Sequence, residues 1–222
     1  MRPVLIDLDG TLHDSAAIVT EALDAMVRDK LGEVHPREYY LRFVGPPLTE
    51  TMKTLGGPER VDELVAAYRE YYGARMLRTQ LFPGMRHMLE VLDAAGVPMA
   101  VATSKTLTFT HRILEHQGVA HHFRAICGAP DSARNSTKAT VVADALRQLE
   151  AQGVDISSAL MVGDRKHDAE GAAANGLPTV LVTWGAAPES EYELAWRTVN
   201  TAEELTELLL DFSRGKVEPV LV

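Results

Sequence analysis

Short apolar runs alternate with segments of helical periodicity along most of the chain. The first run, Val4–Ile6, stops at an acidic glycine turn and predicts a buried strand. Later apolar runs predict strands at 97–102, 125–127, 159–162 and 179–182. Apolar residues spaced three and four positions apart predict helices at 85–95, 106–117, 139–150, 168–174 and 201–212. This alternation favours an α/β fold with a doubly wound parallel sheet covered by helices on both faces.

A stretch of purely helical character interrupts the alternation after the first strand. The helices predicted in it cover 14–31, 37–44, 48–55 and 58–76. Because the other strands all follow this stretch, the simplest topology inserts a helical cap, residues 15–81, into an α/β core made of residues 1–14 and 82–222. The two crossings between cap and core, near Ser15 and Leu81, would then act as hinges.

The composition suits a soluble globular protein with one core domain and a smaller insertion. Of the 222 residues, 46% are hydrophobic and 24% are charged, and the formal net charge at pH 7 is −9. A negative chain is repelled by the phosphate backbone of DNA and RNA, so a nucleic-acid polymer is not expected as a partner. A small anionic substrate stays compatible, because the local charge of a cleft can oppose the global sign.

Cys127 is the only cysteine, so no disulfide bond can form within the chain. A single cysteine fits a reducing compartment. The N-terminal residues lead directly into the first strand, unlike a signal peptide, and no apolar run reaches membrane-spanning length. We therefore expect a cytoplasmic monomer or homodimer that has no membrane partner.

Polar residues gather where three of the predicted strands end. The sequence Asp-Leu-Asp-Gly-Thr at 7–11 follows the first strand, Thr-Ser-Lys at 103–105 follows the second, and Gly-Asp-Arg-Lys-His-Asp at 163–168 follows a later one. Lys138 opens a predicted helix and can point to the same rim. In an open parallel sheet, ligands bind beyond the carboxyl ends of the strands. These segments therefore form the candidate functional site.

Four carboxylates belong to this rim, namely Asp7, Asp9, Asp164 and Asp168. Like unit charges about 4 Å apart repel by roughly 4 kcal/mol at an effective dielectric near 20, so the cluster needs a cation or partial protonation. Oxygen ligands without histidine or cysteine favour Mg²⁺ over zinc. Since Mg²⁺ commonly binds through a few carboxylates together with a substrate phosphate, the site suggests phosphoryl chemistry with Mg²⁺ as cofactor.

The polar segments resemble, in the same order, the motifs of the haloacid dehalogenase superfamily. The resemblance rests on Asp-Leu-Asp-Gly-Thr-Leu at 7–12, Thr103, Lys138 and Gly-Asp-Arg-Lys-His-Asp at 163–168. The helical insertion after the first motif is similar to the first cap type of this superfamily. Three further segments resemble its phosphoglycolate phosphatase-like branch: Phe-Val-Gly-Pro-Pro-Leu at 43–48, Thr-Ser-Lys at 103–105 and Ile-Cys-Gly-Ala at 126–129.

The resemblance implies roles for the four carboxylates. Asp7 would attack phosphorus and form an aspartyl-phosphate, which splits hydrolysis into two easier steps. Asp9 would protonate the leaving oxygen and then take a proton from water, while its backbone carbonyl would also meet the metal. Asp7 and Asp164 would bind Mg²⁺ directly. Asp168 would bind it through water or directly, and it could instead, or in addition, cap the next helix.

The same resemblance implies contacts with the phosphoryl group. These fall to Gly10, Thr103, Ser104 and Lys138, with Lys138 also neutralising the charge of Asp7. Weaker candidates for substrate contact or support are Thr11, Gly45, Lys105 and Arg134. Lys105 and Arg134 would serve equally well as solvated surface charges. Gly45 either brings a cap loop to the substrate or only breaks a helix.

The function implied by the resemblance is Mg²⁺-dependent hydrolysis of a small phosphorylated metabolite, with phosphoglycolate as the leading candidate. A 5′-nucleotidase or a sugar-phosphate phosphatase is the nearest alternative, because the core motifs handle only the phosphoryl group. A phosphosugar mutase would suit Asp7 and Asp9 equally, whereas a dehalogenase would lack Asp9. A non-catalytic binding protein with this fold is the least expected, because the set of polar residues is complete.

Overall fold

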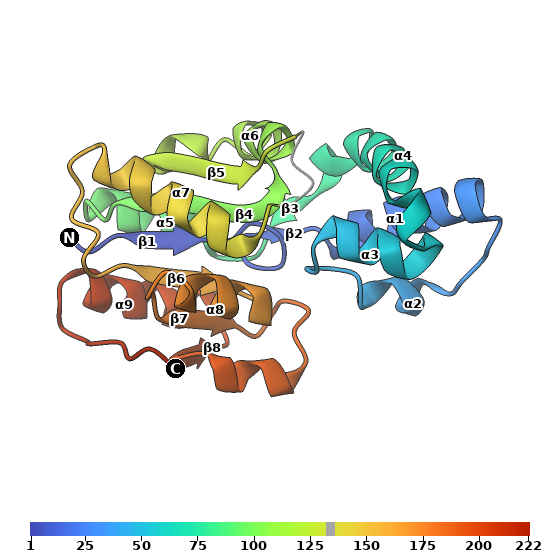
Figure 1. Cartoon of the computed structure of the whole chain (residues 1–222). Helices are drawn as coiled ribbons and strands as arrows, with labels where there is room; N and C mark the ends of the chain where they lie inside the picture. The colour runs from blue at the N-terminus through green and yellow to red at the C-terminus, as the bar shows by residue number, and fades with distance from the viewer. Residues whose placement is uncertain (132–135) are drawn as a thin grey trace.

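A six-stranded parallel sheet forms the centre of the protein (Figure 1). The computed structural model describes residues 1–131 and 136–222, so the predicted Arg134 lies outside the described residues. The strands lie in the order β5-β4-β1-β6-β7-β8. Their bounds are β1 Val4–Ile6, β4 Met99–Thr106, β5 Ala125–Ala129, β6 Leu160–Gly163, β7 Thr179–Val182 and β8 Arg197–Val199. Because β1 pairs with both β4 and β6, the three strand ends that carry the predicted motifs are neighbours at one edge.

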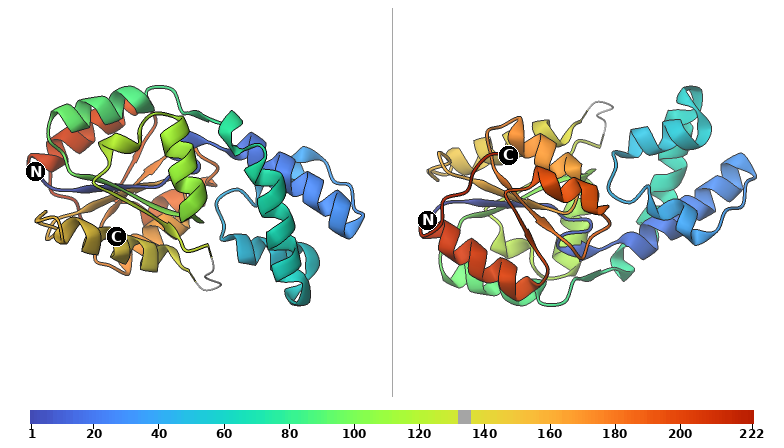
Figure 2. Two further views of the ribbon diagram at one scale, coloured as in Figure 1. Left: turned by 90° about the horizontal axis from the view of Figure 1, so that it is seen from above. Right: turned by 90° about the horizontal axis from the view of Figure 1, so that it is seen from below.

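Helices cover both faces of the sheet (Figure 2). One face carries α5 (Met85–Ala94), α6 (Leu107–His116) and α9 (Ala202–Ser213), and the other carries α7 (Lys138–Glu150) and α8 (Lys166–Ala173). Side chains alternate across the central strand, since Val4 and Ile6 belong to one buried cluster and Leu5 to the other. Burial on both faces explains why these strands appear in the sequence as continuous apolar runs.

The helical insertion lies at the end of the molecule that is opposite both chain termini (Figure 1, Figure 2). It contains α1 (Ala16–Leu31), α2 (Arg37–Leu41), α3 (Leu48–Gly56) and α4 (Val61–Gly73). Helices α1 and α4 pack together through apolar residues such as Leu23, Met26 and Leu64, which are fully or almost fully buried. The predicted fold class, an α/β core with a helical cap, is therefore confirmed. Among the described residues, no helix has both the length and the apolar character needed to cross a bilayer.

A short antiparallel ribbon joins the two crossings between cap and core. Strand β2 (His13–Asp14) pairs with β3 (Gln80–Leu81), with His13 opposite Leu81 and Asp14 opposite Gln80. Two-residue strands carry no readable periodicity, so this ribbon was absent from the sequence-based expectation. The division into a core of residues 1–14 and 82–222 and a cap of residues 15–81 stays a prediction.

The helices predicted at 37–44, 58–76 and 168–174 differ most from those in the structure. The first is shorter than predicted, because α2 ends at Leu41. The predicted helix at 58–76 is instead the short 3-10 helix η1 (Pro58–Arg60), then α4, then the 3-10 helix η2 (Met76–Arg78). Helix η2 leads into β3, the second strand of the ribbon. Helix α8 begins at Lys166, two residues before the predicted start, because the carboxylate of Asp168 accepts hydrogen bonds from backbone N–H groups preceding the helix.

Two elements near the C-terminal end of the sheet were not predicted. They are the edge strand β8 and the 3-10 helix η4 (Glu189–Leu194). Only Val199 of β8 is buried, so the strand lacks the apolar run that identifies a central strand. Helix η4 is largely polar, yet it contains the buried carboxylate of Glu191, which becomes important at the edge of the site.

Candidate active site

The carboxyl ends of β1, β4 and β6 surround a cavity of about 150 Å³ under the cap. Most of the predicted site residues line it, namely Asp7, Asp9, Gly45, Thr103, Ser104, Lys105, Lys138, Asp164 and Asp168. Gly10 and Thr11 do not line the cavity. Thr11 is fully buried, and its carbonyl accepts a hydrogen bond from the indole N–H of Trp184 at 3.0 Å. The fold therefore brings together residues up to 161 positions apart, from Asp7 to Asp168.

Three buried carboxylates lie close enough to share one cation. Each of Asp7, Asp164 and Asp168 offers an oxygen within 4.8 Å of the others. Burial raises the pKa of Asp7 to about 6, despite the opposing charge of Lys138. Burial, followed by the charges of Asp168 and Asp7, raises the pKa of Asp164 well above its ordinary value. A divalent cation would remove this repulsion, and an all-oxygen donor set fits Mg²⁺.

Lys138 holds the predicted nucleophile in place. Its ammonium group lies 2.6 Å from Oδ1 of Asp7, 2.6 Å from Oδ1 of Asp168 and 2.9 Å from the carbonyl oxygen of Ala102. The ammonium donates hydrogen bonds to Asp7 and Ala102, and its charge also pairs with Asp168. Burial opposes the charge of this lysine, but the two carboxylates outweigh burial and raise its pKa. Its carbon stem passes closely over Gly171, where an added Cβ would lie 2.5 Å from Cγ of Lys138.

Two glycines make room for Asp164. Gly10 has a φ of +80°, and a Cβ there would lie 2.3 Å from Oδ2 of Asp164. A Cβ at Gly185 would also lie 2.3 Å from this oxygen. The sequence predicts Gly10 as a phosphate-binding residue, and its contacts give it a second reason to be glycine. Gly185 was not predicted; it follows the end of β7, but it carries no motif of its own.

Asp164 and Asp168 use their oxygens differently. Oδ2 of Asp168 accepts the backbone N–H groups of Asp164 at 3.1 Å and Arg165 at 3.0 Å, while Oδ1 faces Lys138. Asp164 accepts one hydrogen bond, from the backbone N–H of Ala186 at 3.1 Å. Asp168 thus organises the loop that presents Asp164, which is consistent with a metal ligand that acts through water.

We predict that Asp164→Asn weakens Mg²⁺ binding more than Asp168→Asn does. At a direct ligand, asparagine replaces a charged metal–oxygen contact by a weaker neutral one, whereas a change at a residue that orients the ligands typically costs about 10–100-fold in affinity. Asparagine keeps the side-chain volume and one acceptor oxygen at each position. Calorimetric titration of Mg²⁺ into both variants measures the difference. Equal losses would mean that both carboxylates contact the metal.

We also predict that Mg²⁺ raises the Tm more at about pH 7.5 than at about pH 5. A folded-state pKa of about 6 for Asp7 exceeds that of an unfolded aspartate. Between these two values the folded protein binds more protons than the unfolded chain, so the metal-free protein loses stability as the pH rises. Protons also compete with the metal for these oxygens. Thermal unfolding with Mg²⁺ or with EDTA at both pH values tests this, and a larger shift at the lower pH would contradict it.

Asp9 is held by Lys105 on one carboxylate oxygen and by His13 on the other. Its Oδ2 lies 2.7 Å from the ammonium of Lys105, and its Oδ1 lies 3.3 Å from Nδ1 of His13. Burial tends to raise the pKa of Asp9, but the charge of Lys105 and the hydrogen bond with His13 outweigh burial and lower it. His13 is fully buried, and its other ring nitrogen contacts the hydroxyl of Thr79 next to the hinge. No local pattern indicates this contact, because Thr79 lies 66 residues from His13.

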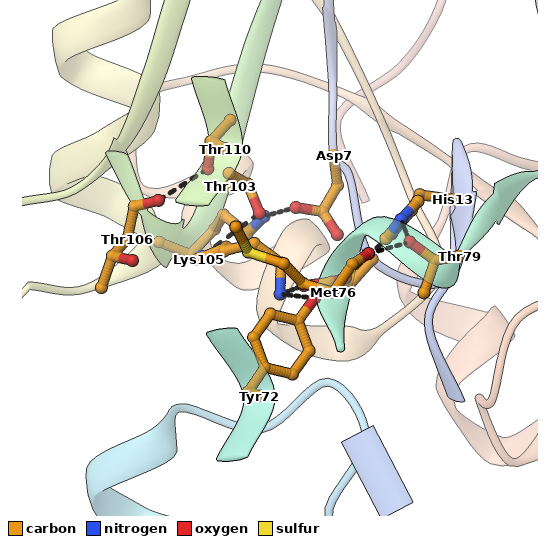
Figure 3. A network of polar contacts seen from close by, with 11 residues as sticks. Asp7, His13, Tyr72, Met76, Thr79, Thr103, Lys105, Thr106 and Thr110 are labelled. Carbon is orange, nitrogen blue, oxygen red and sulfur yellow. Dashed lines mark hydrogen bonds and ion pairs between the residues drawn. The ribbon is translucent and has the colours of Figure 1, made fainter. Parts of the chain in front are cut away.

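The cap supplies an apolar wall opposite the carboxylates. Tyr68 and Tyr72 of α4 stack with ring centroids 5.6 Å apart, and Phe109 of α6 lies 5.7 Å from Tyr72. The hydroxyl of Tyr72 accepts a hydrogen bond from the ammonium of Lys105 at 2.8 Å (Figure 3). On the core side, the buried hydroxyl of Thr103 accepts the backbone N–H of Lys105 at 3.3 Å. The cavity therefore has a charged floor, and its roof combines these aromatic rings with aliphatic cap residues such as Val19 and Leu48.

Comparison with known proteins identifies the family. Residues 4–182 match the family model described as haloacid dehalogenase-like hydrolase, so the chain belongs to that family. The tyrosine-protein kinase PtkA of Mycobacterium tuberculosis is 40% identical over 183 residues, which are 82% of this chain and 62% of that protein. This chain thus spans less than two thirds of PtkA.

Other relatives carry the names of phosphatases. A 5′-nucleotidase of Pseudomonas aeruginosa is 34% identical over 192 residues, 85% of either chain. A phosphoglycolate phosphatase of Aquifex aeolicus is 28% identical over 186 residues, 83% of this chain and 86% of that one. Among solved structures, a predicted phosphatase from Clostridium acetobutylicum superposes with a TM-score of 0.87 at 32% identity, covering 95% of this chain and 98% of that one. The resemblance to the superfamily that the motifs indicated is confirmed.

Proposed function

We propose that the protein is a phosphatase that hydrolyses small phosphate monoesters with Mg²⁺ through a phosphorylated Asp7. The observation that carries the proposal is the clamp on Asp7: a buried carboxylate at a strand end, bound by Lys138 and flanked by Asp164 and Asp168. Such a carboxylate is held in one orientation and its charge is compensated, yet it still lines the cavity. Membership of a hydrolase family whose relatives include named phosphatases supports the same conclusion.

The first half-reaction transfers the phosphoryl group to the protein. Lys138 holds Oδ1 of Asp7, which leaves Oδ2 as the oxygen that forms the new bond to phosphorus. As that bond forms, the bond from phosphorus to the leaving oxygen breaks, and Asp9 gives a proton to the leaving oxygen. Asp9 would take up this proton when the substrate carboxylate draws Lys105 away from it, since the charge of Lys105 otherwise lowers its pKa. Asp7, Asp164 and the backbone carbonyl of Asp9 would hold Mg²⁺, which would supply charge compensation for the phosphoryl oxygens. Thr103 and Ser104, which line the cavity, would donate hydrogen bonds to the same group.

The second half-reaction restores the protein. Asp9, now a carboxylate, takes a proton from a water molecule whose oxygen forms a bond to phosphorus. The bond between phosphorus and Oδ2 of Asp7 breaks, which releases inorganic phosphate and regenerates the free carboxylate of Asp7. Because Asp9 returns to its protonated form, the cycle closes without a further proton donor.

We propose that the preferred leaving group carries a carboxylate, as in 2-phosphoglycolate. The ammonium of Lys105 lies between Asp9 and the cap residue Tyr72, beside the place where the leaving oxygen meets Asp9. A carboxylate on the leaving group would complement that charge at short range. The cavity volume of about 150 Å³ is below the ~300–1,000 Å³ that is usual for drug-sized ligands, which also favours a small substrate.

Nucleotides are the nearest alternative substrates. The aromatic roof formed by Tyr68, Tyr72 and Phe109 could stack on a planar base, and one relative is named a 5′-nucleotidase. A panel containing 2-phosphoglycolate, nucleoside 5′-monophosphates, sugar phosphates and phosphotyrosine, each assayed with Mg²⁺ and with EDTA, tests the proposal. Absence of phosphate release from every ester in the presence of Mg²⁺ would refute hydrolysis.

The relation to PtkA raises a second candidate, namely phosphoryl transfer from a nucleotide to tyrosine. We rank it second because PtkA is longer than the matched region, so part of that protein has no counterpart in the match. Incubation with γ-labelled ATP and a tyrosine-containing protein separates the two functions. Label on tyrosine supports the kinase, whereas unlabelled tyrosine together with phosphate release from an ester of the panel supports hydrolysis.

Lys105→Met is predicted to lower kcat/KM for 2-phosphoglycolate at least about tenfold more than for p-nitrophenyl phosphate. Both substrates lose the partner of Asp9, but only phosphoglycolate also loses a partner for its carboxylate. Lys53→Met, at an exposed lysine of α3, is the matched control and should leave the ratio unchanged. An equal loss for both substrates would show that Lys105 serves only Asp9.

We further propose a cytoplasmic protein with residues 15–81 as the substrate-covering cap. The proposed binding partner is a small phosphorylated metabolite rather than a nucleic-acid polymer or a membrane. A monomer and a homodimer are both compatible with a site formed entirely within one chain. Sedimentation of the purified protein distinguishes these two states.

A further inference from the structure

One cationic side chain connects the loop of Asp164 to the cap. Arg165 follows Asp164 directly, and its side chain is nine-tenths buried. Its Nη1 donates a hydrogen bond to the carbonyl oxygen of Val44 at 2.6 Å, across 121 positions of sequence. Val44 belongs to the loop between α2 and α3, so this hydrogen bond joins cap and core at the edge of the cavity.

Glu191 fixes the guanidinium of Arg165 from the other side. Nε of Arg165 lies 3.0 Å from Oε2 of Glu191, and Nη2 lies 3.1 Å from Oε1. Glu191 also accepts the backbone N–H of Lys166 at 2.7 Å, which anchors it to the start of α8. A bidentate ion pair between buried groups has a defined geometry, so the Nη1 atom of Arg165 points toward Val44 in one direction.

The cap loop fits against Arg165 only because residue 45 is glycine. Gly45 has a φ of +103°, and an added Cβ would lie 2.9 Å from Cγ and 3.0 Å from Nη1 of Arg165. The sequence analysis left open whether Gly45 approaches the substrate or only breaks a helix. Its closest neighbour is instead the side chain of Arg165, which makes the contact a fitted interface between cap and core.

We propose that Arg165, oriented by Glu191, is a positioning residue that fixes the Val44–Gly45–Pro46 loop over the site and thereby determines which leaving groups are accepted. This inference rests on the proposed phosphatase function. Glu191 and Val44 already accept hydrogen bonds from three of the five N–H donors of the guanidinium. Arg165 therefore acts through the loop rather than by binding the phosphoryl group directly. The loop residues line the cavity on the cap side, where leaving groups differ from one another.

The test compares Gly45→Ala in two backgrounds, the natural chain and the double variant Arg165→Ala/Glu191→Gln. The second change avoids leaving an unpaired buried carboxylate. In the natural chain, Gly45→Ala should reduce kcat/KM for the best substrate of the panel at least about fivefold relative to p-nitrophenyl phosphate, mainly through KM. In the double variant, where Cγ and Nη1 are gone, the same change should alter that ratio by less than about twofold.

Gly57→Ala is the matched control. Gly57 is another cap glycine with positive φ, +80°, but an added Cβ there meets nothing within 4 Å. It should therefore leave the substrate ratio unchanged in either background. Equal effects of Gly45→Ala in the two backgrounds would overturn the proposal, as would an unchanged substrate ratio in the Arg165→Ala/Glu191→Gln variant.

Hydrogen exchange supplies a readout that needs no turnover. In the double variant the backbone amides of Phe43, Val44, Gly45 and Leu48 should exchange at least about tenfold faster than in the natural chain, while those of α7 stay unchanged. Unchanged exchange at these amides would overturn the positioning role. If the natural chain hydrolyses none of the esters, the phosphatase proposal fails, and this comparison still decides whether Arg165 orders the loop.

Discussion

Asp7→Asn is expected to reduce phosphate release to less than about 1% of the natural rate, a barrier increase of more than ~2.7 kcal/mol. Asparagine has nearly the same shape as aspartate, but its amide does not form an acyl phosphate. The side chain lies at the end of β1 with little exposure, where Lys138 can still donate to the amide oxygen. We therefore expect the fold to persist while the chemistry is lost.

The covalent intermediate can be sought directly. Brief incubation of the natural protein with Mg²⁺ and substrate, followed by acid quenching and mass spectrometry, should show one added phosphoryl group on the peptide containing Asp7. Asp14→Asn, which alters an exposed carboxylate of the same segment, is the matched control and should retain activity. Activity of Asp7→Asn above about 1%, with unchanged circular dichroism, would exclude Asp7 as the nucleophile.

The central part of the fold was predictable because its pattern is local. Strands such as β1 and β7 are buried on both faces, so they appear as uninterrupted apolar runs. The edge strand β8 lacks that signature, since two of its three residues are exposed. The β2–β3 ribbon is specified by pairing between residues more than sixty positions apart, which no local pattern reports.

The candidate site likewise contains some residues that a local pattern predicts and others that it does not. Asp7 and Asp164 follow strands, and Thr103 lies in the second half of β4, which extends to Thr106 beyond the predicted end at 102. All three lie at the sheet edge where a ligand is expected, so each could be chosen from its own segment. Glu191 and Gly185 could not be chosen in this way. Glu191 matters only through its contact with Arg165, and Gly185 only through its contact with Asp164. Sequence reasoning thus found the groups proposed to contact the phosphoryl group and metal, and missed those that hold such groups in place.

The contacts of Asp9 illustrate why that difference matters. Its position in the first motif suggests an acid–base role, but the motif alone does not explain how one carboxylate serves two half-reactions. Lys105 on one oxygen and His13 on the other fix its direction, and both contacts lead to the cap or hinge, through Tyr72 and Thr79. The orientation of Asp9 is therefore tied to the placement of the cap.

Asp9→Asn is expected to slow hydrolysis of an alkyl phosphate such as 2-phosphoglycolate by roughly 10²–10⁴-fold. An alkoxide is a poor leaving group, so the first half-reaction depends on proton donation by Asp9. p-Nitrophenolate leaves without a proton, so its release from Asp7 should be much less affected. The second half-reaction needs Asp9 as a base in either case, so phosphorylated Asp7 should accumulate.

The signature of Asp9→Asn with p-nitrophenyl phosphate is thus a burst of about one p-nitrophenolate per site, followed by slow turnover. Rapid-quench measurements resolve the burst, and mass spectrometry detects the phosphorylated protein that accumulates with it. Asp9→Glu, which keeps the carboxylate but displaces it by one methylene, should restore part of the second phase. If Asp9→Asn instead hydrolyses both esters at the natural rate and shows no burst, the proton donated to the leaving group comes from another residue.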